Sequence, residues 1–314
     1  MTSYVLRRVV GLVISCLFIS IIVFLAMRVI PGDPAQIMLG TEADSATLLA
    51  LRSELGLDKP VYIQYWAWLR GILTGQLGNS LRYHVPISDL IASRMAVTVP
   101  LSILAMLIAV IIGLPAGVVA ATHRGGISDY GVMAFSQAGL SIPSFWLAIL
   151  LILLFSLKLQ LLPSGGFVPW DESFLGAIQS LVLPAAALGV IRAAVVSRLS
   201  RSSLLEVIGR DFVRSARAKG LSERVVLWKH SLRNALIPIT TIIGMQFASL
   251  LAGAIIIENV FYLPGLGRLA FQAIGQRDLP VVQDIVVLIA ILVVLMNLIV
   301  DIAYALLDPR IRLE

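Results

Sequence analysis

The side chains best suited to binding chemistry are concentrated in one stretch of the chain, "DFVRSARAKGLSERVVLWKH" (residues 211–230). Its cationic residues are Arg214, Arg217, Lys219, Arg224 and Lys229. Guanidinium and ammonium groups donate hydrogen bonds to carboxylates and phosphates, so the stretch suits recognition of an acidic surface rather than catalysis. It is unusual in a chain that is 59% hydrophobic and only 13% charged.

Groups for catalysis or metal binding do not occur in a usable pattern. The sequence has no G-x-x-x-x-G-K-[ST] phosphate loop, so we do not expect this chain to bind ATP by that route. The histidines, His84, His123 and His230, fall in expected loops without metal-ligand spacing. "PSGG" (163–166) lacks the flanking pattern of a nucleophile elbow. We therefore predict a non-enzymatic chain that binds no metal or cofactor itself.

The elements that must position the basic stretch are membrane-spanning helices. Mean hydropathy is +0.95, and the apolar runs are continuous rather than alternating, which favours helices over a β-barrel. A helix needs about 20 residues to cross ~30 Å of hydrocarbon. Six segments qualify: 9–27, 96–121, 132–157, 174–191, 235–257 and 281–307. We predict an all-α polytopic membrane protein with six transmembrane helices, the fourth interrupted at Pro184 and Gly189.

The basic residues also predict the orientation, because short cytoplasmic loops are rich in Lys and Arg. With both termini in the cytoplasm, fifteen basic residues lie in cytoplasmic segments and three in short external loops. The net charge of +6 is thus explained by topology, and we expect no nucleic-acid partner. The first apolar run is too long for the ~7–15-residue core of a signal peptide.

The segment between the first two spans is expected to form a small helical subdomain on the external face. "IPGDPA" (30–35) ends the first helix, and a capped helix should run from Asp44 or Ser45 to Gly56. "VYIQYWAWLRGIL" follows, rich in aromatic residues that favour the membrane interface. We divide the chain into 1–95, the first helix with this subdomain, and 96–314, the core with five helices and a cytoplasmic loop at 192–234.

Polar residues within the spans are few. Gln137 and Gln246 lie in the middle of the third and fifth spans, where they could line a polar path or bond neighbouring helices. Asn297 and Asp301 share a helical face and are expected to bond a neighbouring helix. A proton relay is the alternative, and it would suit an autonomous ion-coupled carrier.

Within the 192–234 loop, the pattern predicts two short amphipathic helices, 211–218 and 221–231, joined at Gly220. Their apolar edge comprises Val213, Ala216, Leu221, Val225 and Trp228. Such a pair could insert into a protein cleft, with the basic rim steering an acidic partner. From composition alone, a basic amphipathic segment lying on anionic lipid is an equal alternative.

The order Arg214, Ser215, Ala216 and, four residues later, Gly220 resembles the E-A-A-x-x-x-G loop of ATP-binding-cassette (ABC) importer permeases. Here arginine and serine replace the glutamate and first alanine. The longer run "DFVRSARAKGLSERVVLWKHSLRNALIP" resembles the dipeptide/oligopeptide/nickel branch of that family. "LRRVVGLVISCLFISIIVFLAMRVIPGDPA", "LGLDKPVYIQYWAWLRGILTGQLGNSL", "ENVFYLPGLGRLAFQAI" and "LLDPRIR" extend this resemblance over the whole chain. The B-type subunit of a dipeptide permease pair fits best.

The resemblance implies a pore-forming subunit of a type I importer in the bacterial cytoplasmic (inner) membrane. Its implied partners are a homologous second permease, two ABC ATPase subunits that bind ATP and Mg, an external substrate-binding protein and membrane lipid. The implied cargo is a di- or oligopeptide. Nickel chelates, glutathione, opines and oligosaccharides are alternatives within the family.

The resemblance also assigns roles to residues. For coupling to the ATPases we select the residues around the glycine: Arg214, Ala216, Arg217, Lys219, Gly220, Leu221 and Ser222. For the external gate or binding-protein contact we select Phe261, Pro264, Gly265 and Gly267 in "FYLPGLG". Glycine tolerates unusual dihedral angles, which would suit a tight re-entrant turn there.

Overall fold

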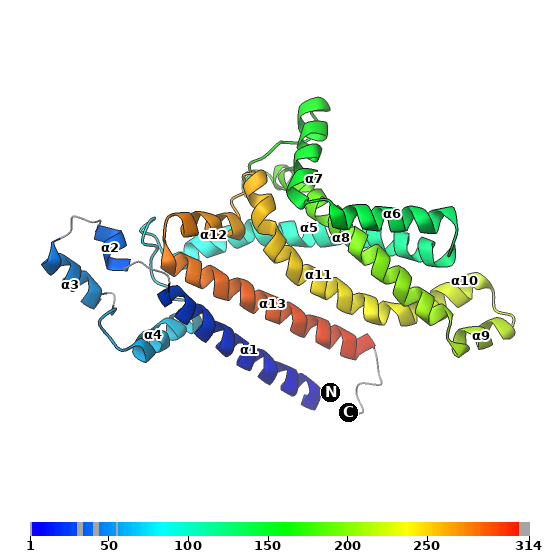
Figure 1. Ribbon diagram of the computed structural model, residues 1–314, viewed down its shortest axis with the longest axis horizontal. Coiled ribbons are helices and arrows are strands. Elements are labelled where there is room, and N and C mark those ends of the chain that lie inside the picture. Colours follow the sequence, from blue (N-terminus) through cyan, green and yellow to red (C-terminus); the bar gives the residue numbers. More distant parts are fainter. Residues whose placement is uncertain (1, 30–33, 40–43, 55, 308–314) are drawn as a thin grey trace.

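The computed structural model of the protein describes residues 2–29, 34–39, 44–54 and 56–307, and its regular elements there are all helical (Figure 1). The α-helices are α1 (Thr2–Val29), α2 (Pro34–Leu39), α3 (Ser45–Glu54), α4 (Val61–Thr74), α5 (Ile87–Thr122), α6 (Ile127–Ser141), α7 (Ser144–Leu151), α8 (Phe174–Ile208), α9 (Asp211–Ala218), α10 (Glu223–Val225), α11 (Arg233–Val260), α12 (Leu266–Gly275) and α13 (Leu279–Leu307). Two π-helical segments are η1 (Ile152–Lys158) and η2 (Val226–Leu232). The predicted all-α class is confirmed.

Five helical stretches of the described chain are each long and apolar enough to cross a membrane. They are Leu6–Val29, Ile87–Thr122, Phe174–Ile208, Glu223–Leu251 and Leu279–Ile302. The third predicted span is a bent pair instead, because α6 and α7–η1 meet at 103°. A proline ring disfavours the helical conformation of the residue before it, and Ile142 is extended before Pro143 (φ −85°, ψ 124°). The predicted third span over 132–157 is therefore broken, and counting the bent pair as one span gives the six spans that were predicted.

The fourth span is longer and more regular than predicted. Helix α8 continues without a break through Pro184 to Ile208, so the expected interruption at Pro184 and Gly189 does not occur. Gly189 lies instead where α8 crosses α5: a Cβ at this position would be 2.6 Å from the carbonyl oxygen of Ala105. Much of the predicted 192–234 loop is thus an extension of a spanning helix.

Small residues bring α5 and α8 into close contact over several turns. A Cβ on Gly113 would lie 2.7 Å from the Ala193 carbonyl oxygen, and one on Gly117 would lie 2.6 Å from the Ser197 carbonyl oxygen. Helices in membranes associate through such close packing, since lipid supplies no hydrophobic driving force between them. Gly113 and Gly117 therefore allow the close approach of α5 and α8.

Replacing Gly113 by alanine should lower the free energy of unfolding by about 1–3 kcal/mol, the usual effect of overpacking. Gly131 on α6 is a matched control, because a Cβ there meets nothing within 4 Å. Gly131→Ala should leave stability unchanged or raise it by up to about 1 kcal/mol. Thermal unfolding followed by tryptophan fluorescence in detergent would compare them. Equal midpoints for both variants would contradict the close-packing account.

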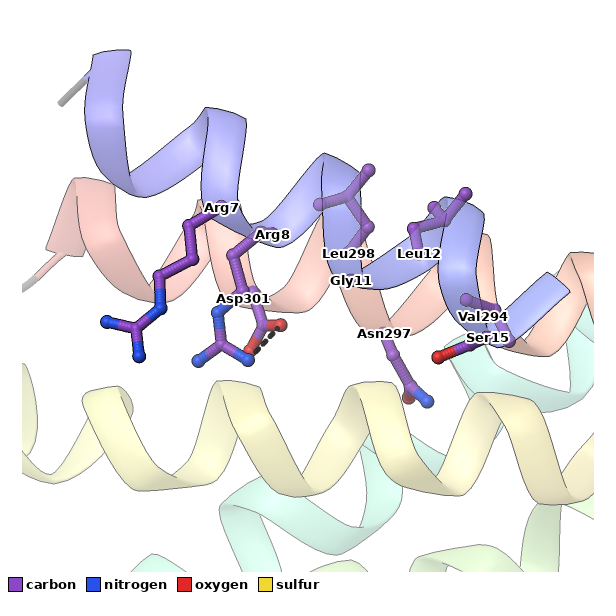
Figure 2. Close-up of a pocket in the computed structure, with 9 residues that line it drawn as sticks. All are labelled: Arg7, Arg8, Gly11, Leu12, Ser15, Val294, Asn297, Leu298 and Asp301. Carbon is purple, nitrogen blue, oxygen red and sulfur yellow. Dashed lines mark ion pairs between the residues drawn. The ribbon is translucent and has the colours of Figure 1, made fainter. Parts of the chain in front are cut away.

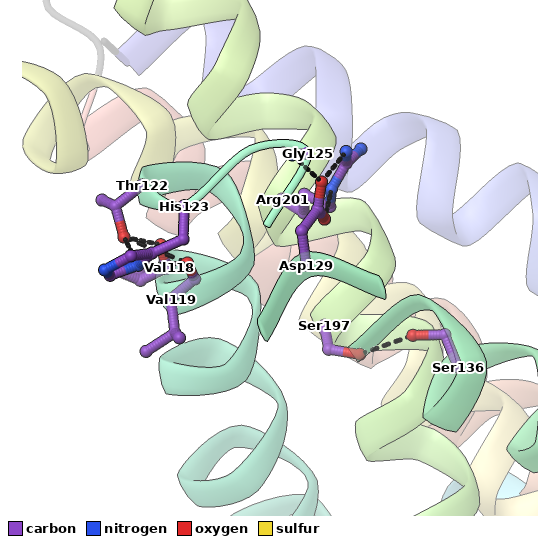
Figure 3. Close-up of polar contacts among 9 residues, drawn as sticks. All are labelled: Val118, Val119, Thr122, His123, Gly125, Asp129, Ser136, Ser197 and Arg201. Atoms are coloured by element: carbon purple, nitrogen blue, oxygen red, sulfur yellow. Dashed lines mark hydrogen bonds and ion pairs between the residues drawn. The ribbon is translucent and has the colours of Figure 1, made fainter. Parts of the chain in front are cut away.

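Helix α6 is fastened to α8 by polar contacts (Figure 3). The carboxylate of Asp129, almost fully buried, accepts hydrogen bonds from Arg201 Nη2 at 2.7 Å and from the Gly125 backbone N–H at 2.9 Å. Further along, the hydroxyls of Ser136 and Ser197 are 2.9 Å apart. The two helices therefore share an ion pair and a hydroxyl contact in addition to their apolar packing.

The first and last spans lie side by side and share a pocket of about 560 Å³ (Figure 2). Arg8 Nη1 of α1 lies 3.1 Å from Asp301 Oδ2 of α13, and Asn297 lines the same pocket. The expected bond between this face and a neighbouring helix is thus present. The contact crosses from 1–95 into 96–314, a division that stays a prediction.

The segment before α5 is attached to the spans by carboxylates. Asp278 is buried and accepts a hydrogen bond from Ser80 Oγ at 2.5 Å, and Asp284 accepts one from Trp68 Nε1 at 2.8 Å. Trp68 is therefore a structural residue, whereas Tyr62 and Trp66 are exposed, as interfacial anchors would be.

Helix α3 begins at Ser45, and Gly56 follows it with φ +66°, close to the predicted bounds. Residues 30–33 of "IPGDPA" and 308–312 of "LLDPRIR" lie outside the described residues.

Candidate functional site

The basic stretch forms a sharp turn, which we call the elbow (Arg210–Val225), composed of α9, the turn at Gly220 and α10. Gly220 N donates to Arg217 O at 2.9 Å, and Leu221 N donates to Ala216 O at 3.4 Å. This is a Schellman motif, whose turning residue adopts a left-handed conformation that favours glycine. Gly220 has φ +78°. The predicted role of Gly220 in turning the chain is confirmed by this geometry.

One face of α9 packs inward. Val213 and Ala216 are buried in a cluster that includes Leu204 and Val207 of α8. Val226 and Leu232 of η2 belong to the same cluster, as do Val118 and Ala121 of α5. Ala216, which we selected for contact with a partner, thus packs within the chain itself. The elbow is consequently a folded part of the helical body.

The opposite face of the elbow is exposed and cationic. Lys219 and Arg224 have no acidic partner among the residues that the structure describes, and Arg214 lies 3.7 Å from the exposed Asp211. Phe212 and Leu221 are about 40% exposed beside these charges. Ser222 is also exposed, and no atom lies within 4 Å of a Cβ built on Gly220. This face has the composition of a protein-docking surface, with apolar side chains among charged ones.

Arg217 forms an ion pair within the elbow. Its Nε and Nη2 atoms donate to the two carboxylate oxygens of Glu223 at 2.8 and 3.1 Å, across the turn at Gly220. These hydrogen bonds raise the pKa of Arg217 above its ordinary value. A bidentate pair is geometrically specific, so Arg217 holds α9 and α10 in their relative orientation. While this pair is intact, the charge of Arg217 is compensated within the chain.

The helical body has two different ends (Figure 1). The elbow is at one end of the long axis, whereas α12 and α2–α4 are at the other. At the α12 end the chain folds around Glu258, which is fully buried. Its carboxylate accepts hydrogen bonds from Thr98 Oγ1 at 2.6 Å and from the backbone N–H of Arg268 at 2.9 Å. The turn after α11 is thereby fixed to α5.

The glycines of "LPGLG" leave room for the close packing around Glu258. A Cβ on Gly265 would be 2.2 Å from Glu258 Oε1, and one on Gly267 would be 2.5 Å from the Cα of Ile255. Gly265 itself has an ordinary φ of −103°. The left-handed residue is Tyr262, at φ +54°. Glycine is therefore required there because of close approach and not, as we expected, because of unusual dihedral angles.

The four residues selected for an external contact are mostly internal. Phe261 is 1% exposed, its carbonyl oxygen accepts a hydrogen bond from Gly166 N at 2.8 Å, and Gly265 and Gly267 are buried. Pro264 is partly exposed. The exposed side chain of this turn is Tyr262, whose ring lies 4.8 Å from the Arg268 guanidinium carbon. A direct partner contact of the four residues stays a prediction, but their position supports a structural contribution to the turn.

The two glutamines that were predicted to lie in the middle of spans have different surroundings. Gln137 on α6 is exposed. Gln246 Oε1 accepts a hydrogen bond at 3.1 Å from Arg192 Nη1 of α8. Arg192 was counted among the loop residues of the cytoplasmic side, but α8 places it against the middle of α11. Whether either glutamine lines a pore stays a prediction.

Sequence reasoning missed four residues with structural or functional importance: Asp129, Arg192, Arg201 and Glu258. Each is a charged residue that contacts a residue more than fifty positions away. A lone acid within or beside an apolar helix was the available signal for Asp129 and Glu258, because a buried charge is expensive unless it is paired or hydrogen-bonded. The two arginines were assigned to a loop because α8 was taken to end at 191.

Family comparison covers nearly the whole chain. Residues 113–313 match the model of the binding-protein-dependent transport system inner membrane component. Residues 1–102 match the model of the N-terminal part of such membrane components. The two matches together include the elbow, the turn around Glu258 and all candidate spans except residues 103–112 of the second one.

Individual relatives give the same result. The chain is 44% identical over 314 residues to a peptide transport system permease protein of Brucella abortus (strain 2308), covering 100% of both chains. It is 42% identical over 312 residues to a glutathione transport system permease protein of Escherichia coli O6:H1, covering 99% of each chain. A chain of the inward-facing MetNI methionine ABC transporter shares the fold, with a TM-score of 0.57 at 22% identity over 70% of this chain and 96% of that chain.

Proposed function

The chain belongs to the family of binding-protein-dependent transport system inner membrane components, as an ABC permease of the dipeptide/oligopeptide type, and from this we propose that it forms half of the pore of an ATP-driven peptide importer. A homologous permease supplies the other half. Two separate ATPase subunits that hold ATP and Mg dock on the elbow, and an external binding protein delivers cargo at the α12 end.

The observation that carries this proposal is the outer face of the elbow. It combines exposed cations, Lys219 and Arg224, with the exposed apolar side chains Phe212 and Leu221. An anionic lipid surface would also attract the cations. The internal Arg217–Glu223 pair favours a protein partner, because a turn of defined shape suits a complementary cleft better than a fluid surface.

The elbow is connected to two spanning helices, so a movement of the elbow would move both of them. Helix α9 packs through Val213 and Ala216 on the end of α8. Helix α10 continues through η2 into α11. A force on the elbow therefore acts on both α8 and α11. Closure of the ATPases would tilt these two spans together and switch the pore between its inward- and outward-facing forms, since packed helices move as rigid elements.

The same assignment gives the orientation. The elbow faces the cytoplasm, where basic loops are retained, and the α12 end faces outward, in a bacterial inner membrane. Helix α7 and the segment η1 that continues it project from the bundle with exposed apolar side chains, among them Trp146 of α7 and Leu153 and Leu157 of η1. We assign this surface to lipid or to the second permease.

Peptides are the proposed cargo because the relative from Brucella abortus is named as a peptide permease, and the match covers the whole length of both chains. Glutathione is the second candidate, because the E. coli relative named for it is almost as similar. Both cargoes are short peptidic compounds with free carboxylates. The external binding protein is expected to decide between them.

Reconstitution tests the proposal. The chain would be incorporated in liposomes with its candidate second permease, ATPases and binding protein, and uptake of radiolabelled Ala-Ala and glutathione measured. We expect uptake only with ATP and all subunits present. Uptake by the chain alone down a proton or sodium gradient would identify an autonomous carrier and overturn the proposal.

A further inference from the structure

Arg192 is a cation near the middle of the membrane-spanning body. The adjacent Ala193 lies against Gly113, well inside α5. Across the interface, the Arg192 guanidinium reaches Gln246, which is midway along α11 (Arg233–Val260). Ionisable residues at this depth are costly and generally mark substrate or ion pathways.

The hydrogen bonds of Arg192 leave its charge uncompensated. Nη1 donates to Gln246 Oε1 at 3.1 Å, and Nη2 donates to the Ser249 backbone oxygen at 3.2 Å. Both acceptors are neutral, and no carboxylate of the described residues lies within ion-pair distance of Arg192. A guanidinium has five N–H donors in a planar fork, so donors remain for another acceptor.

The surroundings of Arg192 leave access for such an acceptor. Gly253 faces the guanidinium, and a Cβ there would already be 3.6 Å from Nη2, so a larger side chain would crowd the group. On the same helix, Met245 is 60% exposed, and Ser249 is also exposed. The Arg192 side chain thus lies beside a face of α11 that this chain leaves uncovered.

We propose that Arg192 binds the carboxylate of a peptide cargo during its passage between the two permeases. The inference rests on the proposed function and adds a chemical requirement, a free carboxylate on the cargo. A carboxylate matches the guanidinium fork and forms charge-assisted hydrogen bonds. Gln246 and the Ser249 carbonyl hold the guanidinium in position when no cargo is present. Arg192 is thereby a specificity-determining residue of the membrane subunit itself.

The test compares two probes in the reconstituted transporter, Ala-Ala and its C-terminal amide. The same binding protein is used with every permease variant, so its own preference cancels in the ratio of the two uptake rates. Arg192→Gln should lower the free-acid to amide ratio about tenfold or more, as expected for loss of a charge-assisted bond. Arg192→Lys should retain most of the ratio, because the charge remains.

Arg198→Gln on the same helix is the matched control, because it removes one positive charge without a described contact to Gln246. It should leave the ratio unchanged. An equal fall in the ratio for both variants would show a general field effect and overturn the proposal. A parallel loss of uptake of both probes in Arg192→Gln would also overturn it, because the arginine would then serve folding or pairing with the second permease. Failure of the wild-type transporter to take up Ala-Ala would instead reject the proposed function.

Discussion

Replacing Gly220 by glutamate is expected to abolish transport-coupled ATP hydrolysis while leaving membrane insertion intact. Gly220 has φ +78° at the turn of the elbow, and a residue with a Cβ in that conformation costs about 1–2 kcal/mol. The new carboxylate would also add a negative charge next to Lys219 in the chain, on the face proposed to meet acidic groups of the ATPase. ATPase activity of the reconstituted complex, with and without loaded binding protein, measures the effect.

Gly125→Glu is the matched control for this experiment. Gly125 also has φ +78°, and a Cβ there also meets nothing within 4 Å, but it lies in the connection between α5 and α6. The two variants therefore share backbone strain, exposure and added charge. Only the elbow variant should lose coupled hydrolysis. If Gly220→Glu hydrolyses ATP normally in response to cargo, the elbow is not the coupling site.

The second large effect is expected for Glu258→Ala. Glu258 is fully buried and accepts hydrogen bonds from Thr98 Oγ1 and the Arg268 backbone N–H. Alanine would leave these buried donors unsatisfied, at about 1–3 kcal/mol each, and would leave a cavity beside Gly265. We expect the free energy of unfolding to fall by about 3 kcal/mol or more.

Thermal unfolding of the purified chain in detergent would measure this difference. Glu172→Ala is the control, because Glu172 is exposed in the connection before α8, and it should change stability by no more than about 0.5 kcal/mol. Glu258→Gln should be intermediate, since one acceptor oxygen remains. A wild-type unfolding midpoint for Glu258→Ala would show that the carboxylate does not hold the turn to α5.

Features determined by local chain properties were predictable from the sequence. Continuous apolar runs predicted the spans, and a glycine after an amphipathic helix predicted the turn at Gly220. The family resemblance, based on motifs along the whole chain, was confirmed by the family and homologue matches.

Features determined by packing between distant segments were not predictable. Pro184 suggested a helix end, but the packing of α8 against α5 is compatible with a continuous helix past that proline. Pro143 lies within the predicted third span, yet only the structure shows that the chain bends by 103° there. The inward face of Ala216 and the internal pair of Arg217 depend on where α9 meets α8. A helical pattern shows which residues share a face, but not what that face contacts.

The Arg217–Glu223 pair has a consequence for the rate and strength of docking. A segment that must fold when it binds loses conformational entropy at that moment, which weakens binding. The elbow is already folded in the chain alone, so in the proposed complex little ordering would remain to oppose association. A contact of this kind can form and separate repeatedly without refolding, as a cyclic machine requires.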